Sequence, residues 1–395
     1  MRILHVHEQG AIRGGTEKHI ARLRNIFETN GFKTCLLVTR PLPGLKFDWH
    51  IQGSPSLHSE VPMQCLRKFV DDLLSQFDPN AIIIHGISFP AFILKLAQAA
   101  ICPIYRYMHE PRMVCPGHGK FLYNSETICE KPFDYHCLAS AYKEICAPRN
   151  PKKLLDRFYN TRFELKQGYK YYTKIIVASE YMRKEAVIAG LPACRLFKIP
   201  PPMDIDPVPF RPIPSGLPRI LFVGRISQTK GPHVLIRMLA PLLQRHPDWQ
   251  LDLVGDGIIK NHCIRLADEF SISRQVNFHG WKSSDELEAF YYDCSLVVFP
   301  TLYPEAFGGV GLESFRYGRA VVAFDVGGVS EWLRDGVNGR LVQPGNQIKF
   351  AEAVEDLLSN IPKLNHIGQS SQKMIYDRFG PEVTFKRYCK IFQSS

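Results

Sequence analysis

The sequence predicts an α/β protein made of two doubly wound domains, and three observations support this prediction. The chain has 395 residues, which is about right for two domains of roughly 100 to 200 residues each. Short apolar runs typical of buried parallel strands alternate with segments of helical periodicity. The pattern restarts after a proline-rich segment, residues 199–218, which cannot form a helix interior or a central strand. We therefore expect an N-terminal domain over residues 1–200 and a C-terminal domain over residues 201–376, with a cleft between them.

The N-terminal half begins with a strand, a glycine loop and a helix. The strand is expected at Ile3 to Val6, the loop at Gly14-Gly15-Thr16-Glu17, and the helix where apolar residues recur at helical spacing from Ile20 to Phe27. The other elements predicted in this half include strands over residues 34–38 and 81–84 and a helix over residues 65–77.

The C-terminal half begins with a new strand, Arg219 to Gly224, after the proline-rich segment. Pro232 then stands where a helix would have its first turn, a position at which its missing N–H costs nothing. Further strands are predicted over residues 251–254, 276–278, 296–299 and 320–323.

Composition and charge limit the classes of protein to which this chain can belong. With 45% hydrophobic and 22% charged residues the chain has the composition of a soluble globular protein. No signal-peptide pattern is found at the N-terminus and no apolar run approaches the roughly 20 residues of a membrane-spanning helix, so a cytoplasmic location is expected. The net charge of +11 favours anionic partners, but no recognition motif for nucleic acid accompanies it.

Three glycines between two glutamates follow the strand predicted at residues 296–299. The segment Pro304-Glu305-Ala306-Phe307-Gly308-Gly309-Val310-Gly311-Leu312-Glu313 lies at a strand-to-helix junction. Glycines there let backbone N–H groups approach an anion, and the helix N-terminus adds partial positive charge, so the loop is suited to a diphosphate. The alternative is a glycine-rich turn with two solvated glutamates.

Two cations follow the first strand of the C-terminal half. Arg225 and Lys230 lie in the segment Gly224-Arg225-Ile226-Ser227-Gln228-Thr229-Lys230-Gly231. Ligands of open α/β sheets bind outside the carboxyl ends of the strands, where these side chains would lie. They could neutralise a diphosphate leaving group. The alternative is a pair of solvated surface charges.

Together these two segments resemble glycosyltransferase family 4, retaining enzymes of the GT-B fold. Glu305 and Glu313 match the family's Glu-x7-Glu element, and residues 224–231 match its Gly-Arg-x4-Lys-Gly element. The segment from Ala320 to Trp332, followed by Asn338-Gly339 and Pro344-Gly345, resembles the core of the family's donor domain. The resemblance implies two Rossmann-like domains facing each other across a cleft.

The resemblance also implies roles for residues of the C-terminal domain. Arg225 and Lys230 would hold the donor diphosphate, Glu305 the donor sugar and Glu313 the ribose. Phe307, Gly308, Gly309 and Val310 would contact the phosphate and sugar through their backbone. The nucleotide base would lie near Gly280 and Trp281.

In the N-terminal domain the resemblance concerns two short elements. Gly14, Gly15 and Thr16 match the loop that such enzymes place beside the acceptor, with Gly15 also near the donor phosphate. Tyr107-Met108-His109-Glu110 is similar to the element whose histidine faces the donor sugar, so His109 joins Glu305, Arg225 and Lys230 as a candidate catalytic residue. A tight turn and a structural histidine are the alternatives. Residues 377–395 resemble the family's last helix, which packs on the first domain.

The implied function is the transfer of a hexose-type sugar with retention of configuration. The donor would be UDP- or GDP-linked, the acceptor a hydroxyl of a glycan or lipid-linked molecule, and the process the synthesis of cell-surface polysaccharide or lipopolysaccharide. No cofactor or divalent ion is expected. Two alternatives remain, a catalytically silent nucleotide-sugar binding protein and a GT-B epimerase or hydrolase.

Two further features have open interpretations. Cys115, Cys129, Cys137 and Cys146 could form a structural metal site or a disulfide, but none of the Cys-x2-4-Cys spacings typical of zinc is present, so chance clustering is the alternative. Residues 152–174 carry cations every fourth residue with interleaved aromatics, which predicts one helix with a basic stripe. Such a helix could rest on the inner face of the cytoplasmic membrane, or could simply be solvated.

Overall fold

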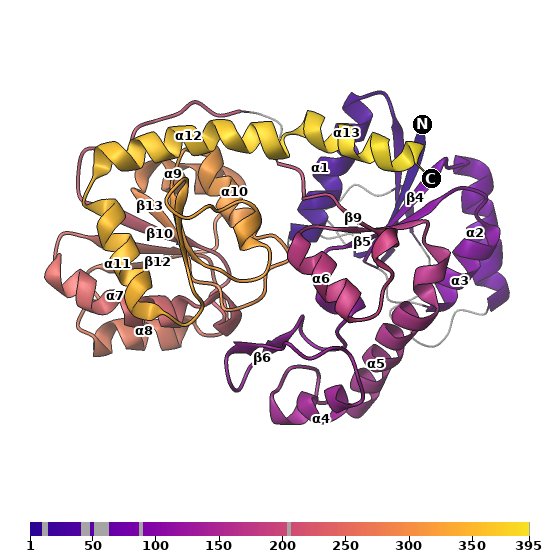
Figure 1. The fold of residues 1–395 in the computed structure, drawn as a ribbon, viewed down its shortest axis with the longest axis horizontal. Coiled ribbons are helices and arrows are strands. Elements are labelled where there is room, and N and C mark those ends of the chain that lie inside the picture. Colours follow the sequence, from indigo (N-terminus) through magenta and orange to yellow (C-terminus); the bar gives the residue numbers. More distant parts are fainter. Residues whose placement is uncertain (10–14, 41–47, 51–62, 87–89, 204–206, 395) are drawn as a thin grey trace. The chain divides into compact units, whose positions relative to one another are not determined.

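The computed structural model describes the chain except for residues 10–14, 41–47, 51–62, 87–89, 204–206 and 395 (Figure 1). The chain divides into two compact units. Unit 1 comprises Met1–Lys120, Glu130–Ile205 and Phe379–Ser395, and unit 2 comprises Phe121–Cys129 and Asp206–Arg378. Each unit is built around its own parallel sheet.

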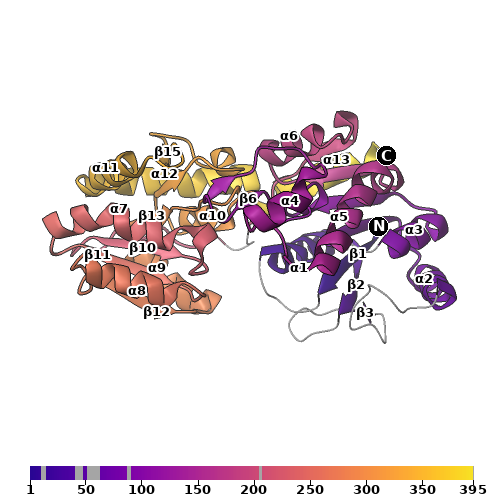
Figure 2. The same ribbon diagram turned by 90° about the horizontal axis from the view of Figure 1, so that it is seen from below.

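The sheet of unit 1 is parallel throughout, in the order β3-β2-β1-β4-β5-β8-β9. Figure 2 shows β1, β2 and β3 side by side. The strands are β1 (Arg2–Gln9), β2 (Lys33–Arg40), β3 (Trp49–His50), β4 (Ala81–Gly86), β5 (Ile104–Met108), β8 (Lys174–Val177) and β9 (Leu196–Lys198). β4, β5 and β8 are buried along their whole length or nearly so, as the continuous apolar runs of parallel strands require.

Most helices of unit 1 lie between its strands in the sequence, and the last one comes from the end of the chain. They are α1 (Gly15–Thr29), α2 (Met63–Phe77), α3 (Pro90–Ala99), α4 (His136–Lys143), α5 (Pro151–Lys166), α6 (Glu180–Ile188) and α13 (Pro381–Gln393). Local sequence sets several of their beginnings. Asn150 accepts a hydrogen bond from the Lys153 N–H at the start of α5, where Pro151 occupies the first turn. Ser179 caps α6 in the same way through Met182 N–H.

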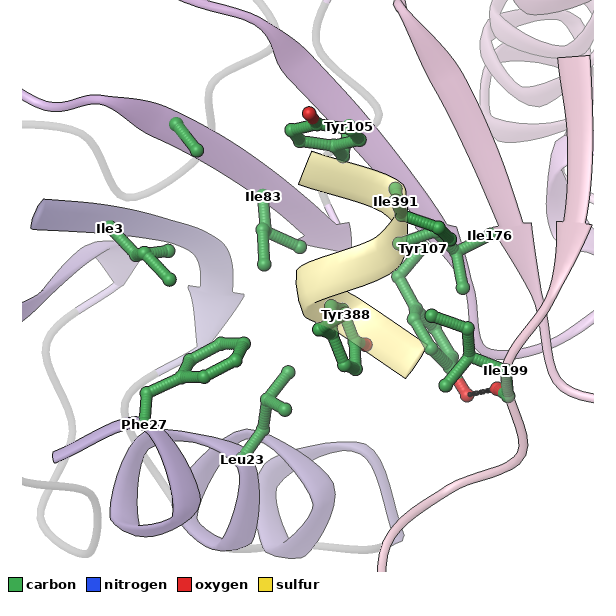
Figure 3. Packing of buried hydrophobic residues seen from close by; sticks show 11 residues of the cluster. Ile3, Leu23, Phe27, Ile83, Tyr105, Tyr107, Ile176, Ile199, Tyr388 and Ile391 are labelled. Atoms are coloured by element: carbon green, nitrogen blue, oxygen red, sulfur yellow. Dashed lines mark hydrogen bonds between the residues drawn. The ribbon is translucent and has the colours of Figure 1, made fainter. Parts of the chain in front are cut away.

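The C-terminal helix α13 completes the core of unit 1. Tyr388 and Ile391 pack with Ile3 of β1 and with Leu23 and Phe27 of α1 (Figure 3). Tyr388 is fully buried. In the same cluster, Tyr107 Oη–H donates a 2.9 Å hydrogen bond to the Ile199 carbonyl.

The sheet of unit 2 has the order β12-β11-β10-β13-β14-β15 and is also parallel. Its strands are β10 (Arg219–Val223), β11 (Gln250–Val254), β12 (Val276–Gly280), β13 (Leu296–Phe299), β14 (Val321–Phe324) and β15 (Gly339–Val342). Its helices are α7 (Pro232–Arg245), α8 (Lys260–Glu269), α9 (Ser284–Asp293), α10 (Gly309–Arg316), α11 (Gln347–Leu358) and α12 (Ile361–Phe379, whose last residue is assigned to unit 1). Figure 1 shows α7, α8 and α11 on one face of this sheet and α9, α10 and α12 on the other.

A small antiparallel hairpin belongs to unit 2 although it is inserted in the sequence of unit 1. Its strands are β6 (Phe121–Leu122) and β7 (Thr127–Ile128). Glu126 at its turn accepts hydrogen bonds from Gln228 Nε2 at 2.6 Å and shares a 3.0 Å contact with His233 Nε2. Gln228 Nε2 also donates to the Tyr123 carbonyl at 3.1 Å. No motif in the sequence predicts that this hairpin packs against residues 228 and 233.

The predicted α/β class with two doubly wound parallel sheets is confirmed. In both sheets the order reverses beside the first strand, β1 in unit 1 and β10 in unit 2. The crevice outside the carboxyl ends of the strands at such a reversal is where open α/β sheets bind ligands.

The single helix predicted over residues 152–174 is wrong. α5 ends at Lys166, a 3-10 turn (Gly168–Tyr171) follows, and Lys174 begins β8. Lys174 is buried, and its Nζ donates to the carbonyls of Ile391 and Ser394 at 3.0 and 2.9 Å. The four-residue spacing of the cations led to the wrong prediction of one helix because Lys174 is held by the end of the chain. Local periodicity does not reveal such a contact.

Candidate functional site

The predicted donor-binding residues of unit 2 lie in segments that follow the carboxyl ends of neighbouring strands. Arg225 and Lys230 follow β10, and the glycine loop of residues 304–313 follows β13. β10 and β13 are hydrogen-bonded neighbours, so these segments leave the same edge of the sheet. Gly280 is the last residue of β12, two strands from β10.

The Lys230 loop is fixed by a close backbone contact. Gly231 has φ of 71° and precedes α7, and a Cβ on it would lie 2.1 Å from the Pro300 carbonyl oxygen. Only glycine therefore allows the two segments to approach this closely. The Leu302 and Tyr303 N–H groups also donate to the Thr229 carbonyl, at 3.0 and 3.1 Å.

Lys230 and Glu305 form an ion pair at the carboxyl ends of β10 and β13. Thr301 Oγ1 donates a 3.0 Å hydrogen bond to the same carboxylate oxygen, Oε1. The side chains are only 21% and 12% exposed. The structure thus brings together one cation and one carboxylate that the sequence placed in separate motifs.

The glycine loop leads directly into the N-terminus of α10. Gly308 caps the helix with φ of 91°, and the first N–H groups of a helix have no intrahelical acceptor. A Cβ on Gly309 would meet no atom within 4 Å, and Gly309 is exposed. The backbone at Gly309 is therefore open to approach by an anion.

Trp332 supports the glycine loop through contacts with Phe307 and Gly311. Its indole Nε1–H donates to the Phe307 carbonyl at 2.5 Å, and a Cβ on Gly311 would lie 2.0 Å from its ring. The neighbouring segment contributes as well, because Gly328 N–H donates to the Glu305 carbonyl at 2.7 Å. Phe307 itself is buried, so its side chain is part of the core.

The remaining predicted residues of unit 2 differ in exposure. Glu313 is half-buried, and Tyr291 Oη–H donates to its Oε2 at 3.3 Å. Trp281 is 76% exposed. Arg225 is exposed, and its side chain makes no hydrogen bond or ion pair with the residues that the structure describes, although its carbonyl accepts from Ser227 N–H at 2.9 Å. Its guanidinium is therefore available to a ligand.

The predicted residues of unit 1 lie at the carboxyl ends of β1 and β5. Gly15 and Thr16 open α1, whereas Gly14 lies outside the described residues. His109 comes directly after β5, and its Nε2 lies 2.9 Å from Nδ1 of His85. Burial is the main cause that lowers the pKa of His109 well below its usual value, so the ring is neutral at pH 7.

His109 belongs to a cluster of histidines that the sequence analysis missed. His5 and His7 lie on β1, His19 on α1 and His85 at the end of β4. Burial lowers the pKa of His5 and of His19 to about 3, and the pKa of His85 also lies well below its usual value. The sequence did contain a signal for this cluster, since histidines occur in or directly after three strand-like runs. These runs form β1, β4 and β5, which are neighbours in the sheet.

Other residues that support the site also escaped the sequence analysis. They are Thr301, which hydrogen-bonds Glu305, and Glu126, which holds Gln228. Neither Thr301 nor Glu126 lies in a sequence motif that would have indicated a role at the site.

The four cysteines are divided between the units. Cys115, Cys137 and Cys146 lie in unit 1, and Cys129 lies in unit 2. The first and last of the four adjoin one turn, because Gly117 N–H donates to Cys115 Sγ at 3.4 Å and His118 N–H to the Cys146 carbonyl at 2.6 Å. A metal or disulfide among these cysteines stays a prediction.

A membrane-spanning helix is not found among the described residues, since none of their helices combines the required length with sufficient apolar character.

Comparisons with known proteins agree with this geometry. Residues 209–374 match the family described as "Glycosyl transferases group 1". A D-inositol 3-phosphate glycosyltransferase of Nocardia farcinica is 33% identical over 208 residues, which are 48% of this chain and 46% of that protein. The lipopolysaccharide core biosynthesis glycosyltransferase LpsE of Rhizobium meliloti is 29% identical over 181 residues, 46% of this chain and 51% of LpsE. These alignments span about half the length of the curated relatives.

A likeness to solved structures extends over the whole chain. Anabaena Alr3699/HepE, solved with UDP and glucose and with UDP-glucose, aligns over 100% of both chains with TM-scores of 0.70 and 0.71 and identities of 19% and 18%. Identity at this level establishes the fold alone.

The protein thus has the GT-B fold, with two Rossmann-like domains. Its residues 209–374, which contain the Lys230–Glu305 pair and the glycine loop, match the glycosyl transferases group 1 family.

Proposed function

We propose that this protein is a retaining glycosyltransferase that moves a hexose-type sugar from a UDP- or GDP-linked donor to a hydroxyl of a glycan or lipid-linked acceptor. The observation that carries the proposal is the Lys230–Glu305 pair beside the open N-terminus of α10, with Arg225 exposed nearby in sequence. UDP is the first donor nucleotide to test, because Alr3699/HepE was solved with UDP and with UDP-glucose. The likeness to LpsE favours lipopolysaccharide or another cell-surface polysaccharide as the product.

The donor diphosphate would lie against the N–H groups that begin α10. Arg225 would contribute a fork of donors and Lys230 a point charge. Glu305 would turn from its contact with Lys230 towards the sugar hydroxyls, and Glu313 would accept hydrogen bonds from the ribose. Gly280 and Trp281 would border the base. These groups are cations and backbone donors, so the proposed transfer requires no divalent ion.

The reaction would proceed on one face of the sugar. The bond between C1 and the diphosphate oxygen breaks, the acceptor oxygen bonds to C1 on the same face, and the acceptor proton passes to the departing phosphate. Charge grows on the diphosphate in the transition state, and Arg225, Lys230 and the α10 N–H groups would stabilise it. Gly15 and Thr16 would border the acceptor, with Gly15 also near the donor phosphate. His109 would hydrogen-bond a hydroxyl of the donor sugar.

Thermal unfolding with UDP, GDP, ADP and their common sugars tests the donor site. A ligand at a hundred times its dissociation constant stabilises the folded protein by about 2.7 kcal/mol. We expect one nucleotide to raise Tm in the wild type and in Arg245→Ala, which removes a cation from an exposed pair with Glu355. Arg225→Ala and Glu313→Ala should both lose the shift. If no nucleotide raises the wild-type Tm, the proposal fails.

Activity assays with the nucleotide sugar that binds distinguish a transferase from an epimerase or hydrolase and from a silent binding protein. Arg225→Ala should fold normally, because Arg225 is exposed, while kcat falls by about 100-fold or more. An NMR determination of the product's anomeric configuration tests retention. Rapid conversion of the sugar nucleotide without any acceptor would instead identify an epimerase or hydrolase, and binding without turnover would identify a silent binding protein.

The acceptor would be met at the inner face of the cytoplasmic membrane. The exposed face of α5 combines Leu155 and Tyr159 with Lys152, Arg162 and Lys166. Tyr159 is 64% exposed, and α4 adds exposed Tyr142 and Lys143. An apolar stripe flanked by cations is suited to the surface of an anionic bilayer.

Vesicle sedimentation tests this surface. We expect binding to vesicles of equimolar phosphatidylcholine and phosphatidylglycerol but not to phosphatidylcholine alone. The change Lys152→Gln with Arg162→Gln should weaken binding by about fivefold for each charge, on a contribution of about 1 kcal/mol per cation. Lys363→Gln, an exposed change in unit 2, is the control. Equal binding by both variants would exclude α5 as the contact.

A further inference from the structure

The histidines at the carboxyl edge of the unit 1 sheet form a group with the spacing of metal ligands. One ring nitrogen from each of His19, His85 and His109 lies within 4.8 Å of the others. His19 and His85 are 3% and 2% exposed, and His109 is half-buried. Because β4 and β5 are neighbours in the sheet and α1 follows β1 beside them, three separate segments bring these rings together.

Two of the rings already have nearly the spacing that a tetrahedral ion requires. His85 Nδ1 and His109 Nε2 are 2.9 Å apart. Two nitrogens bound tetrahedrally to Zn²⁺ at 2.0–2.1 Å would be about 3.3 Å apart. Small rotations of the rings would suffice to admit the ion between them.

His5 is placed to orient His85. The other nitrogen of His85, Nε2, lies 2.9 Å from His5 Nδ1. When Nδ1 of His85 binds a metal, its Nε2 carries the proton and donates to His5. Ligand histidines usually donate their second N–H in this way, which fixes the tautomer and the ring orientation.

His19 lacks the hydrogen bonds that a buried imidazole normally makes. Neither of its ring nitrogens has a hydrogen-bond partner among the described residues. Its ring packs against Tyr107 at 4.4 Å and edge-on to His109 at 4.7 Å between centroids. A neutral imidazole offers one lone pair and one N–H. The unused lone pair is what a metal ion would take.

We propose that His19, His85 and His109 bind a divalent transition-metal ion, with Zn²⁺ as the first candidate. An all-imidazole set suits Zn²⁺, Ni²⁺, Cu²⁺ or Co²⁺, whereas Mg²⁺ and Ca²⁺ prefer oxygen ligands. Three protein ligands leave the fourth tetrahedral position to water or to an oxygen of another molecule. The site lies in unit 1, whereas the residues proposed to hold the diphosphate lie in unit 2, but it shares His109 with the proposed contact to the donor sugar. With Nε2 on the ion, only Nδ1–H of His109 would remain for the sugar. Metal binding is measured without donor or acceptor, so its failure and the failure of the proposed function can be told apart.

Zinc binding by the full-length, tag-free protein tests the proposal. The protein is treated with a chelator, dialysed against Zn²⁺, and analysed for bound metal by mass spectrometry. Titration calorimetry gives the affinity, and a Co²⁺-loaded sample gives the visible spectrum that distinguishes tetrahedral from octahedral coordination. We expect one ion per chain and a tetrahedral spectrum.

Matched variants locate the ion. His19→Gln should weaken Zn²⁺ binding by more than about 100-fold, since a lost ligand costs more than the 10- to 100-fold of a lost orienting partner. His5→Phe, which keeps an aromatic ring in the core, should weaken binding by about 10- to 100-fold. His366→Ala removes an exposed histidine of unit 2 and should leave binding unchanged. Circular dichroism and Tm establish that each variant is folded, and His109→Asn replaces His19→Gln if the latter does not fold.

Three results would overturn the proposal. The first is no stoichiometric binding by the wild type, which would mean that the rings form only a hydrogen-bonded cluster. The second is unchanged affinity in both His19→Gln and His109→Asn. The third is an octahedral Co²⁺ spectrum, which would place the ion on surface groups.

Discussion

At the scale of single residues, glycines decide the shape of the proposed phosphate loop for different reasons. Gly231 and Gly327 allow backbone segments to touch, because a Cβ on either would lie 2.1 or 2.2 Å from a carbonyl oxygen. Gly311 makes room for the Trp332 ring. Gly309 faces no protein atom within 4 Å. The first three glycines are therefore structural, whereas Gly309 keeps the backbone open to a ligand.

Changing Gly311 to alanine should destabilise the protein. The new Cβ would lie 2.0 Å from the Trp332 ring, which is fully buried and tied to Phe307 by its indole N–H. Overpacking of this kind typically costs about 1–3 kcal/mol. Urea unfolding of the wild type and of Gly311→Ala measures the difference. Equal midpoints would show that Trp332 can move aside.

Gly309→Ala is the matched change, two residues earlier in the same helix. It should leave the free energy of unfolding unchanged or slightly higher, since alanine is favoured over glycine in a helix by about 0.5–1 kcal/mol. Nucleotide affinity should nevertheless fall, because the added methyl group occupies the space proposed for the donor phosphate. Calorimetry with the nucleotide that stabilises the wild type checks this. Wild-type affinity in Gly309→Ala would remove the loop from the donor site.

At the scale of elements, the β6–β7 hairpin is held against the segment that carries Arg225 and Lys230. Glu126 contacts Gln228 and His233, and Gln228 stands between the two proposed phosphate ligands in sequence. The 3-10 turn Gln228–Lys230 is thereby tied at its first residue. Its geometry depends on a contact across about a hundred residues of sequence, which no local pattern reveals.

Removing the Glu126 carboxylate should therefore loosen the Lys230 turn. Hydrogen bonds to a charged group contribute about 1.5–3 kcal/mol, so Glu126→Ala should raise the donor KM by about tenfold if most of this energy orders the turn. The Tm should fall only slightly, because Glu126 is not part of the core. Steady-state kinetics with Glu130→Ala, an exposed neighbour, provides the comparison. Identical KM values in the two variants would contradict the coupling.

At the scale of the whole molecule, unit 1 is discontinuous in sequence. Phe379–Ser395 returns to it from the end of the chain, and Tyr388 and Ile391 fill its core. Phe27 meets Tyr388 edge-on with ring centroids 5.3 Å apart. The core of unit 1 is thus complete only when the last helix of the chain is in place (Figure 3).

Tyr388→Ala should accordingly destabilise unit 1. Truncating a large buried aromatic side chain costs about 3–5 kcal/mol through lost burial and the cavity left behind. Lys386→Ala, on the exposed side of α13, should change stability by less than about 0.5 kcal/mol. Calorimetric unfolding of the two variants measures both effects. A small loss in Tyr388→Ala would mean that α13 contributes little to the core.

The sequence by itself determined the α/β class, the two parallel sheets and the segments from Gly224 to Gly231 and from Pro304 to Glu313. These follow from local signals: strand-like apolar runs, helical periodicity, and glycines at strand ends. Only the tertiary structure decided that Lys230 pairs with Glu305, that Trp332 supports the loop at Phe307, and that Lys174 is buried beneath the end of the chain. It also decided that four histidines from β1, α1, β4 and the end of β5 meet. Each of these contacts joins residues far apart in sequence, and such pairs are set by sheet order and packing, which no single segment encodes.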